Sequence, residues 1–313
     1  MEKSVTHPLR AWLLAIRLPT LLIPTIQVWT GTALAYATIG HVNWLIASYA
    51  WIVAVCITIG TNLINDAIDF EKGGDPVNRF GKIKVINAGM LTKSQVYWGG
   101  IFAFAVACAI PFLLPFDTFY CLLIVLLSVT CGYCYTGGPY PISYLGLSEV
   151  FIFIFYGGVC VTVPYYAQTY QLNWQIGVAA AQMGMLAILP NALNNFRDIT
   201  YDAAANKKTL AVRYGREFAA WELTLLVITP FIINIIWLVV GYAAALMPFQ
   251  LIPLVYFFIR AVWKSQTGQM LNRYFGLSVL IHFLFGVASS LGIISIRRHR
   301  LSLKLNEASS TLS

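Results

Sequence analysis

The chain has 313 residues, of which 59% are hydrophobic and only 10% are charged, and its formal net charge is +8. This composition excludes a soluble all-α protein, because such a fold needs a charged outer face that the sequence lacks. Several apolar runs exceed the roughly 18 residues that cross a bilayer as a helix. We therefore expect an all-α membrane protein whose surroundings are the lipid bilayer, with no nucleic-acid partner.

The apolar segments, taken in chain order, predict nine transmembrane helices. The first begins at Arg17 and continues far beyond the apolar core of a signal peptide, so we interpret it as a span. We expect a single domain over residues 1–313, with a frayed polar tail from about residue 302. The predicted spans lie near 18–39, 44–65, 95–115, 118–136, 147–167, 174–194, 219–241, 247–264 and 276–296.

Most Lys and Arg residues fall on one side of this topology. The connections after the first, third, fifth and seventh spans carry none, whereas 66–94 and 195–218 are basic. By the positive-inside rule the basic side faces the cytoplasm, and these two connections form cytoplasmic caps. The basic residues at 297–304 disagree, since nine spans place them on the opposite face. We expect a multi-pass protein of the cell (inner) membrane whose active site faces the cytoplasm.

Two polar clusters end the second and sixth predicted spans. Residues 62–69 and 191–198 both follow the pattern N-x-x-N-[DN]-x-x-D. Side chains three or four residues apart share one face of a helix. Carboxylates at the end of a membrane helix are costly unless they pair, bind a cation or face water. The repeated pattern therefore predicts that the two spans face each other and that one site holds Asp66, Asp69, Asp198 and Asp202.

These residue types favour a magnesium diphosphate site. Mg²⁺ prefers hard oxygen ligands and is held by a few carboxylates together with substrate phosphates. The sequence contains neither a P-loop nor a dinucleotide-binding fingerprint, so the phosphate is expected to be a diphosphate held by metal. Neutral ligands on the same helix faces are Asn62, Asn65, Asn191 and Asn194. The basic residues expected to contact phosphate oxygens are Arg79, Lys84, Arg197, Lys207 and Lys208.

Other interpretations of the clusters remain open. Solvated loop charges explain lone acidic residues better than they explain a repeated pattern at two helix ends. A cation transporter needs charges at the membrane midplane and broken helices, but the spans between the clusters are almost free of charge apart from Glu149. A non-catalytic lipid-binding scaffold would tolerate the loss of Asp66 or Asp198.

Three segments resemble the UbiA superfamily of intramembrane aromatic prenyltransferases, and within it the 1,4-dihydroxy-2-naphthoate polyprenyltransferase branch. They read N-D-A-I-D-F-E-K-G-G-D (65–75), Y-T-G-G-P-Y-P-I-S-Y-L-G (135–146) and N-N-F-R-D-I-T-Y-D-A-A-A-N-K-K-T-L-A-V-R-Y-G (194–215). The resemblance implies nine helices around a central cavity, two Mg²⁺-binding aspartate motifs, a polyprenyl diphosphate donor and dihydroxynaphthoate as the aromatic acceptor. It also implies release of diphosphate and carbon dioxide, giving demethylmenaquinol for menaquinone biosynthesis.

The resemblance assigns roles to further residues, and this sequence departs from the family pattern at some positions. Asp75 follows Lys72-Gly-Gly as in naphthoate-type members, whereas Gly73 stands where related enzymes often carry a third aspartate. Tyr135, Phe151 or Phe155 would offer ring faces to an allylic cation.

Two questions about the acceptor stay open. Arg17 either binds the acceptor carboxylate or is a snorkelling charge that sets topology. Another acceptor, such as 4-hydroxybenzoate, homogentisate or haem, would keep every aspartate and change only the acceptor pocket.

Overall fold

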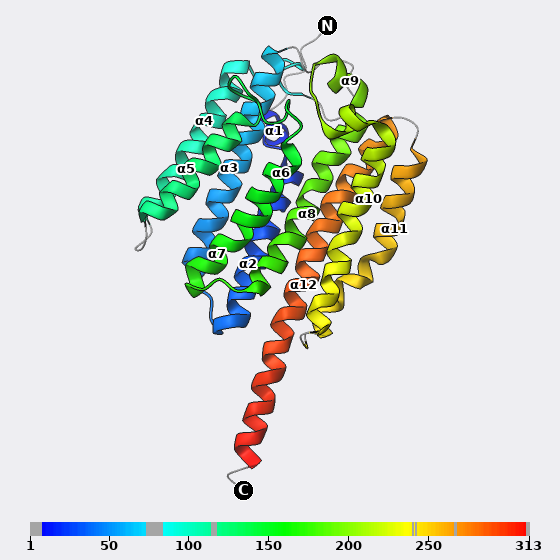
Figure 1. Cartoon of the computed structure of the whole chain (residues 1–313). Coiled ribbons are helices and arrows are strands. Elements are labelled where there is room, and N and C mark those ends of the chain that lie inside the picture. Colours follow the sequence, from blue (N-terminus) through cyan, green and yellow to red (C-terminus); the bar gives the residue numbers. More distant parts are fainter. Residues whose placement is uncertain are drawn as a thin grey trace.

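The computed structural model describes residues 8–72, 84–113, 118–239, 241, 243–265 and 268–310, and every regular element within these ranges is helical. Figure 1 shows the helices side by side in one bundle, with the N-terminus at one end and the C-terminus beyond the other. The predicted all-α class is confirmed.

The first half of the bundle is formed by α1 (Pro8–Ala15), η1 (Leu18–Leu21), α2 (Leu22–Ile39), α3 (Trp44–Glu71), α4 (Lys93–Ala109), η2 (Ile110–Leu113) and α5 (Thr118–Cys134). The second half is formed by α6 (Ser148–Ile152), η3 (Phe153–Val159), α7 (Cys160–Thr169), α8 (Trp174–Arg197), α9 (Ile199–Ala204), α10 (Leu210–Val239), η4 (Ala243–Leu251), α11 (Ile252–Lys264) and α12 (Gly268–Ser310). η3 is π-helical, and the other three η elements are 3₁₀ helices.

Seven helical segments of the described chain are long and apolar enough to cross a membrane. An eighth is obtained when α1 and the continuous segment Leu18–Ile39 are taken as one span bent by 49°. Helix α5 is also apolar, but it has only 17 residues. The chain is therefore a multi-pass membrane protein by the length and composition of its helices, and the count of nine spans stays a prediction.

Side-chain caps set the start of several helices. Asn43 precedes α3 and its side chain accepts hydrogen bonds from the backbone N–H groups of the first turn, and Asn173 does the same before α8. Thr92 and Gln95 form a reciprocal capping box at the start of α4. These polar caps lie at the ends of the apolar runs, where the backbone N–H groups have no partner within the helix.

Glycines allow the helices to approach closely. A Cβ on Gly157 of η3 would lie 2.6 Å from the carbonyl oxygen of Ala180 and 2.7 Å from Cα of Gly184, both on α8. A Cβ on Gly31 of α2 would lie 2.1 Å from a backbone oxygen of α7. The main apolar core fills the space between α2, α7, α8, α10, α11 and α12, and a smaller core joins α1, α3 and α4. Both cores hold the helix ends that carry the polar clusters.

The helices near the two ends of the chain are bent or extend beyond the bundle. Arg17 separates α1 from η1 with a left-handed backbone (φ 58°), so the chain bends at the start of the predicted first span. Helix α12 continues to Ser310 and projects beyond the bundle (Figure 1); the frayed tail from about residue 302 stays a prediction.

Candidate active site

One cavity of about 930 Å³ contains nearly all the predicted site residues. Its deeper walls are apolar and come from α2, α3, α5, η3 and α7, with Ile57, Val125, Phe155 and Val163 among them. Its polar side is lined by Arg17, Asn62, Asn65, Asp66, Asp69, Tyr135, Asn191, Asn194, Arg197, Asp198, Asp202 and Lys207. The cavity therefore joins the two motif helices, α3 and α8, in one site, as their shared pattern predicts.

The aspartates of α3 are buried and bonded to basic side chains. Asp66 is 5% exposed and forms ion pairs with Arg17 and with Lys84, whose Nζ lies 2.7 Å from Asp66 Oδ1. Asp69 is 3% exposed; Lys207 Nζ lies 2.9 Å from its Oδ2, and the Tyr144 hydroxyl donates to its Oδ1 at 3.1 Å. These partners offset the cost of holding two carboxylates away from water.

The second aspartate cluster begins where α8 ends. Asp198 is fully buried, and Arg197 approaches it in a fork, with Nε 2.8 Å from Oδ1 and one terminal nitrogen 2.7 Å from Oδ2. The other terminal nitrogen of Arg197 donates to Asn272 on α12. Asp202, 2% exposed, follows on the short helix α9 and lines the same cavity. Both clusters thus combine carboxylates with guanidinium or ammonium groups.

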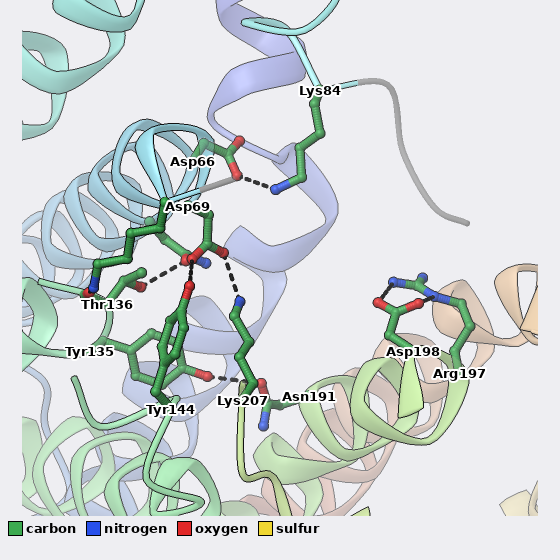
Figure 2. A network of polar contacts seen from close by, with 12 residues as sticks. Asp66, Asp69, Lys84, Tyr135, Thr136, Tyr144, Asn191, Arg197, Asp198 and Lys207 are labelled. Carbon is green, nitrogen blue, oxygen red and sulfur yellow. Dashed lines mark hydrogen bonds and ion pairs between the residues drawn. The ribbon is translucent and has the colours of Figure 1, made fainter. Parts of the chain in front are cut away.

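Lys207 connects the two halves of the site, as Figure 2 shows. It follows α9 in the chain but bonds to Asp69 on α3. The Tyr144 ring lies between two ammonium groups, with Lys207 Nζ and Lys72 Nζ each 4.8 Å from its centroid. The loop between α5 and α6 is fixed further by the backbone N–H of Lys208, which donates to the Tyr144 carbonyl at 2.9 Å. Long-range contacts therefore position the residues that the motif spacing alone does not bring together.

The amide side chains form a second polar layer. Asn65 Oδ1 accepts a hydrogen bond from Thr136 at 2.7 Å, and Asn62 Nδ2 donates to Thr20 at 3.0 Å. Asn191 Oδ1 accepts from the Tyr135 hydroxyl at 2.9 Å (Figure 2).

The charges around the cavity are balanced within the described residues. Four aspartates and four basic side chains, Arg17, Lys84, Arg197 and Lys207, border the cavity, and ion pairs join the basic side chains to Asp66, Asp69 and Asp198. A bound diphosphate would add several negative charges to this neutral set. Cations that arrive with it would restore the balance and would release the basic side chains from the aspartates to the phosphate oxygens.

The donor set fits Mg²⁺ that shares its ligands with a phosphate. Within the described ranges, no three His, Cys, Asp or Glu side chains gather closely enough to hold a metal on their own. The carboxylates instead lie in pairs, two from each half of the bundle, with amide oxygens nearby. Mg²⁺ is usually bound by one or two carboxylates and completed by water and substrate phosphates, so this arrangement suits it.

Three predicted ligands are not part of the described cavity. Lys208 is exposed and lies outside the lining, although its backbone anchors the Tyr144 loop. Asp75 and Arg79 lie outside the described residues. Arg17 is ion-paired with Asp66, a role that neither of its two proposed interpretations included.

Three further residues bond to the site although the predicted set of ligands does not include them. Tyr144 and Thr136 bond directly to motif residues, and Glu149 accepts hydrogen bonds from Asn191 and Asn195. An isolated acid in an apolar span was the available signal for Glu149, because such a residue needs a polar partner.

Comparisons with known proteins agree with this geometry. Residues 22–291 match the UbiA prenyltransferase family. The 1,4-dihydroxy-2-naphthoate octaprenyltransferase of Haemophilus influenzae is 30% identical over 224 residues, covering 68% of this chain and 72% of that protein. The enzyme of the same name from Escherichia coli is 33% identical over 217 residues, covering 66% of this chain and 69% of that protein.

A solved structure shares the fold. The UbiA homolog from Archaeoglobus fulgidus bound to DMAPP and Mg²⁺ superimposes with a TM-score of 0.62 at 14% sequence identity, covering 91% of this chain and 99% of that one.

Proposed function

The chain belongs to the UbiA prenyltransferase family, and from that premise we propose that it transfers a polyprenyl group from polyprenyl diphosphate to 1,4-dihydroxy-2-naphthoate. Diphosphate and carbon dioxide leave, and demethylmenaquinol forms for menaquinone biosynthesis. One observation carries the proposal: four buried aspartates, matched by four basic side chains, border one cavity whose deeper wall is apolar. Relatives named 1,4-dihydroxy-2-naphthoate octaprenyltransferase support this choice of acceptor.

The diphosphate and the polyprenyl chain of the donor bind at different ends of the cavity. The diphosphate binds at the aspartates, where Arg17, Lys84, Arg197 and Lys207 exchange carboxylate partners for phosphate oxygens. The polyprenyl chain lies against the apolar wall, since burying it there removes hydrocarbon from water. Placing this enzyme in the bilayer therefore keeps a long apolar substrate in an apolar phase.

Mg²⁺ is the proposed cofactor, held by Asp66, Asp69, Asp198 and Asp202 with help from Asn62, Asn65, Asn191 and Asn194. When bound, it supplies positive charge that stabilises the diphosphate leaving group. The Mg²⁺ in the solved Archaeoglobus fulgidus homolog supports this assignment. Asp75, Arg79 and Lys208 stay proposed donor contacts from the sequence alone.

The chain's own residues then control the transfer. The allylic C–O bond breaks with its electron pair on the diphosphate, and the basic side chains stabilise that charge as it develops. The rings of Phe151 and Phe155, stacked with centroids 6.2 Å apart, and Tyr135 line the cavity where they can face the allylic carbon. The electron-rich naphthoate attacks this carbon and a carbon–carbon bond forms. In the net reaction the prenyl group replaces the carboxylate.

The orientation in the membrane follows from the charge distribution. We propose nine spans, which requires both the bent first segment and α5 to cross, and an active site that faces the cytoplasm across the inner membrane. The positive-inside bias of the connections supports this orientation.

A reconstituted assay tests the function. Purified protein in lipid vesicles is supplied with Mg²⁺, a polyprenyl diphosphate and a panel of acceptors, and products are identified by mass. We expect prenylated, decarboxylated naphthoquinol from dihydroxynaphthoate. Product from 4-hydroxybenzoate or homogentisate alone would reassign the acceptor. Absence of diphosphate release with every acceptor would contradict a prenyltransferase.

A further inference from the structure

Glu149 is a buried carboxyl group that the proposed mechanism does not use. It lies in the first turn of α6, is 8% exposed, and forms no salt bridge with any residue in the described part of the chain. Its Oε2 is buried and has no hydrogen-bond partner there. A charged or polar group kept in an apolar span is expensive, so its retention points to a function that the apolar residues around it cannot provide.

Both partners of Glu149 are amides of α8 that line the cavity. Asn195 Nδ2 donates to Glu149 Oε1 at 2.8 Å, and Asn191 Nδ2 approaches the same oxygen at 3.5 Å. Asn191 Oδ1 is occupied by the hydroxyl of Tyr135. A carboxylate oxygen can only accept, so each amide must turn its amino group toward Glu149. For Asn195, this leaves Oδ1 as the polar atom available to the cavity, with no partner among the described residues.

The packing of η3 against α8 fixes this contact. The close approach of Gly157 to Gly184 sets the register of the two helical segments. Glu149 lies eight residues before Gly157, and Asn195 lies eleven residues after Gly184 on the antiparallel segment. At 1.5 Å per residue these separations correspond to roughly 12 and 16 Å along the helix axes. The Glu149–Asn195 hydrogen bond therefore joins two segments whose relative position is fixed by packing, and this bond sets the orientation of the Asn195 amide.

The depth of Asn195 matches the place of the acceptor ring. It lies three residues before Asp198 on α8, roughly 5 Å along the helix axis toward the apolar part of the cavity. The first carbon of the donor must sit just below its diphosphate, so the attacking aromatic ring has to reach this level. Phe151, two residues after Glu149, lines the same cavity and offers a ring face.

We propose that Glu149 is a positioning residue that turns the amide oxygen of Asn195 into the cavity, where this oxygen accepts a hydrogen bond from a ring hydroxyl of the aromatic acceptor. The inference rests on the proposed function and adds the group that selects a hydroxylated ring. A ring hydroxyl that donates a hydrogen bond to the Asn195 amide oxygen is more electron-rich at its own oxygen. This electron density stabilises the positive charge that builds on the ring during attack.

The test compares dihydroxynaphthoate with its two monomethyl ethers. In each ether a methyl group replaces the hydrogen of one hydroxyl, so that this oxygen can no longer donate a hydrogen bond. Wild-type protein is expected to prefer the free hydroxyl at one of the two positions by about tenfold or more in kcat/KM. Asn195→Ala and Glu149→Leu should flatten this preference and raise the acceptor KM, while the donor KM stays within about twofold. Glu149→Gln should keep the preference, because its Oε1 still accepts from Asn195 Nδ2.

One further measurement separates positioning from a structural role. Equilibrium binding of dihydroxynaphthoate without donor or Mg²⁺ should weaken in Asn195→Ala and stay unchanged in the control Glu217→Leu, which alters an exposed acid of α10. Should Glu149→Leu fail to fold, Asn195→Ala and Glu149→Gln decide the question alone.

An unchanged hydroxyl preference in Asn195→Ala, equal losses for donor and acceptor in Glu149→Leu, or a lost preference in Glu149→Gln would overturn the inference. If wild-type protein accepts another hydroxylated ring and not dihydroxynaphthoate, the proposed function fails, and the same variants are then compared on that ring and its methyl ether.

Discussion

Replacing Lys207 with Met removes the positive charge that joins the two halves of the site. Lys207 Nζ lies 2.9 Å from Asp69 Oδ2, and the two side chains are 9% and 4% exposed. At an effective dielectric constant of about 20, unit charges at this distance attract by roughly 6 kcal/mol, before the desolvation of both groups is subtracted. Removing one partner of a buried pair costs about 3–5 kcal/mol, because the other charge is left uncompensated.

The Tyr144 hydroxyl also donates to Asp69, at 3.1 Å, and we expect this bond to remain in the variant. We therefore expect Lys207→Met to lower the free energy of unfolding by about 3 kcal/mol, the lower end of that range. Equilibrium unfolding in mixed detergent and SDS micelles measures this change. Lys208→Met is the matched control, since its side chain is exposed and outside the cavity; its stability should change by less than about 0.5 kcal/mol.

Mg²⁺ gives the same variant a second readout. Without diphosphate, Lys207 and the metal compete for Asp69, so Mg²⁺ should stabilise Lys207→Met more than the wild-type protein. A cation present at a hundred times its Kd adds about 2.7 kcal/mol to the free energy of unfolding. The reasoning is refuted if Lys207→Met is as stable as Lys208→Met, or if Mg²⁺ stabilises variant and wild type equally.

Three more predictions follow from the metal, the packing and the topology. Removing Mg²⁺ with EDTA should abolish transfer reversibly, and Asp198→Asn should lower kcat by about a thousandfold in a protein that remains inserted; full activity in EDTA would contradict the metal site. Gly157→Ala should destabilise the protein by about 1–3 kcal/mol, because its Cβ meets a backbone oxygen of α8, whereas Gly158→Ala, with open space around its Cβ, should be nearly neutral in the same unfolding measurement. A cysteine at Lys208 should react with a membrane-impermeant thiol reagent from the cytoplasm and one at Gln171 from the opposite side; labelling of both from one side would contradict the proposed topology.

Local sequence determined the helices and the faces that carry the motifs. Apolar runs of membrane-spanning length have to satisfy their backbone hydrogen bonds internally, so their helical state follows from composition. Asp66 and Asp69 share a face because the spacing of three residues is a property of the helix itself. The same reasoning placed Asn191 and Asp198 on one helix, and the structure finds all four in one cavity.

The partners of these residues were decided only by the tertiary structure. Lys207 bonds to Asp69 across 138 positions, and Asn195 reaches Glu149 across 46. No local pattern encodes such pairs, because they depend on how closely the helices pack and on the loops that close between them. Glycine contacts as tight as that between η3 and α8 set the relative position of whole helices, and with it which charge each carboxylate meets. The sequence thus determined which groups the site contains, and packing determined that Arg17 pairs with Asp66 and that Lys208 stays outside.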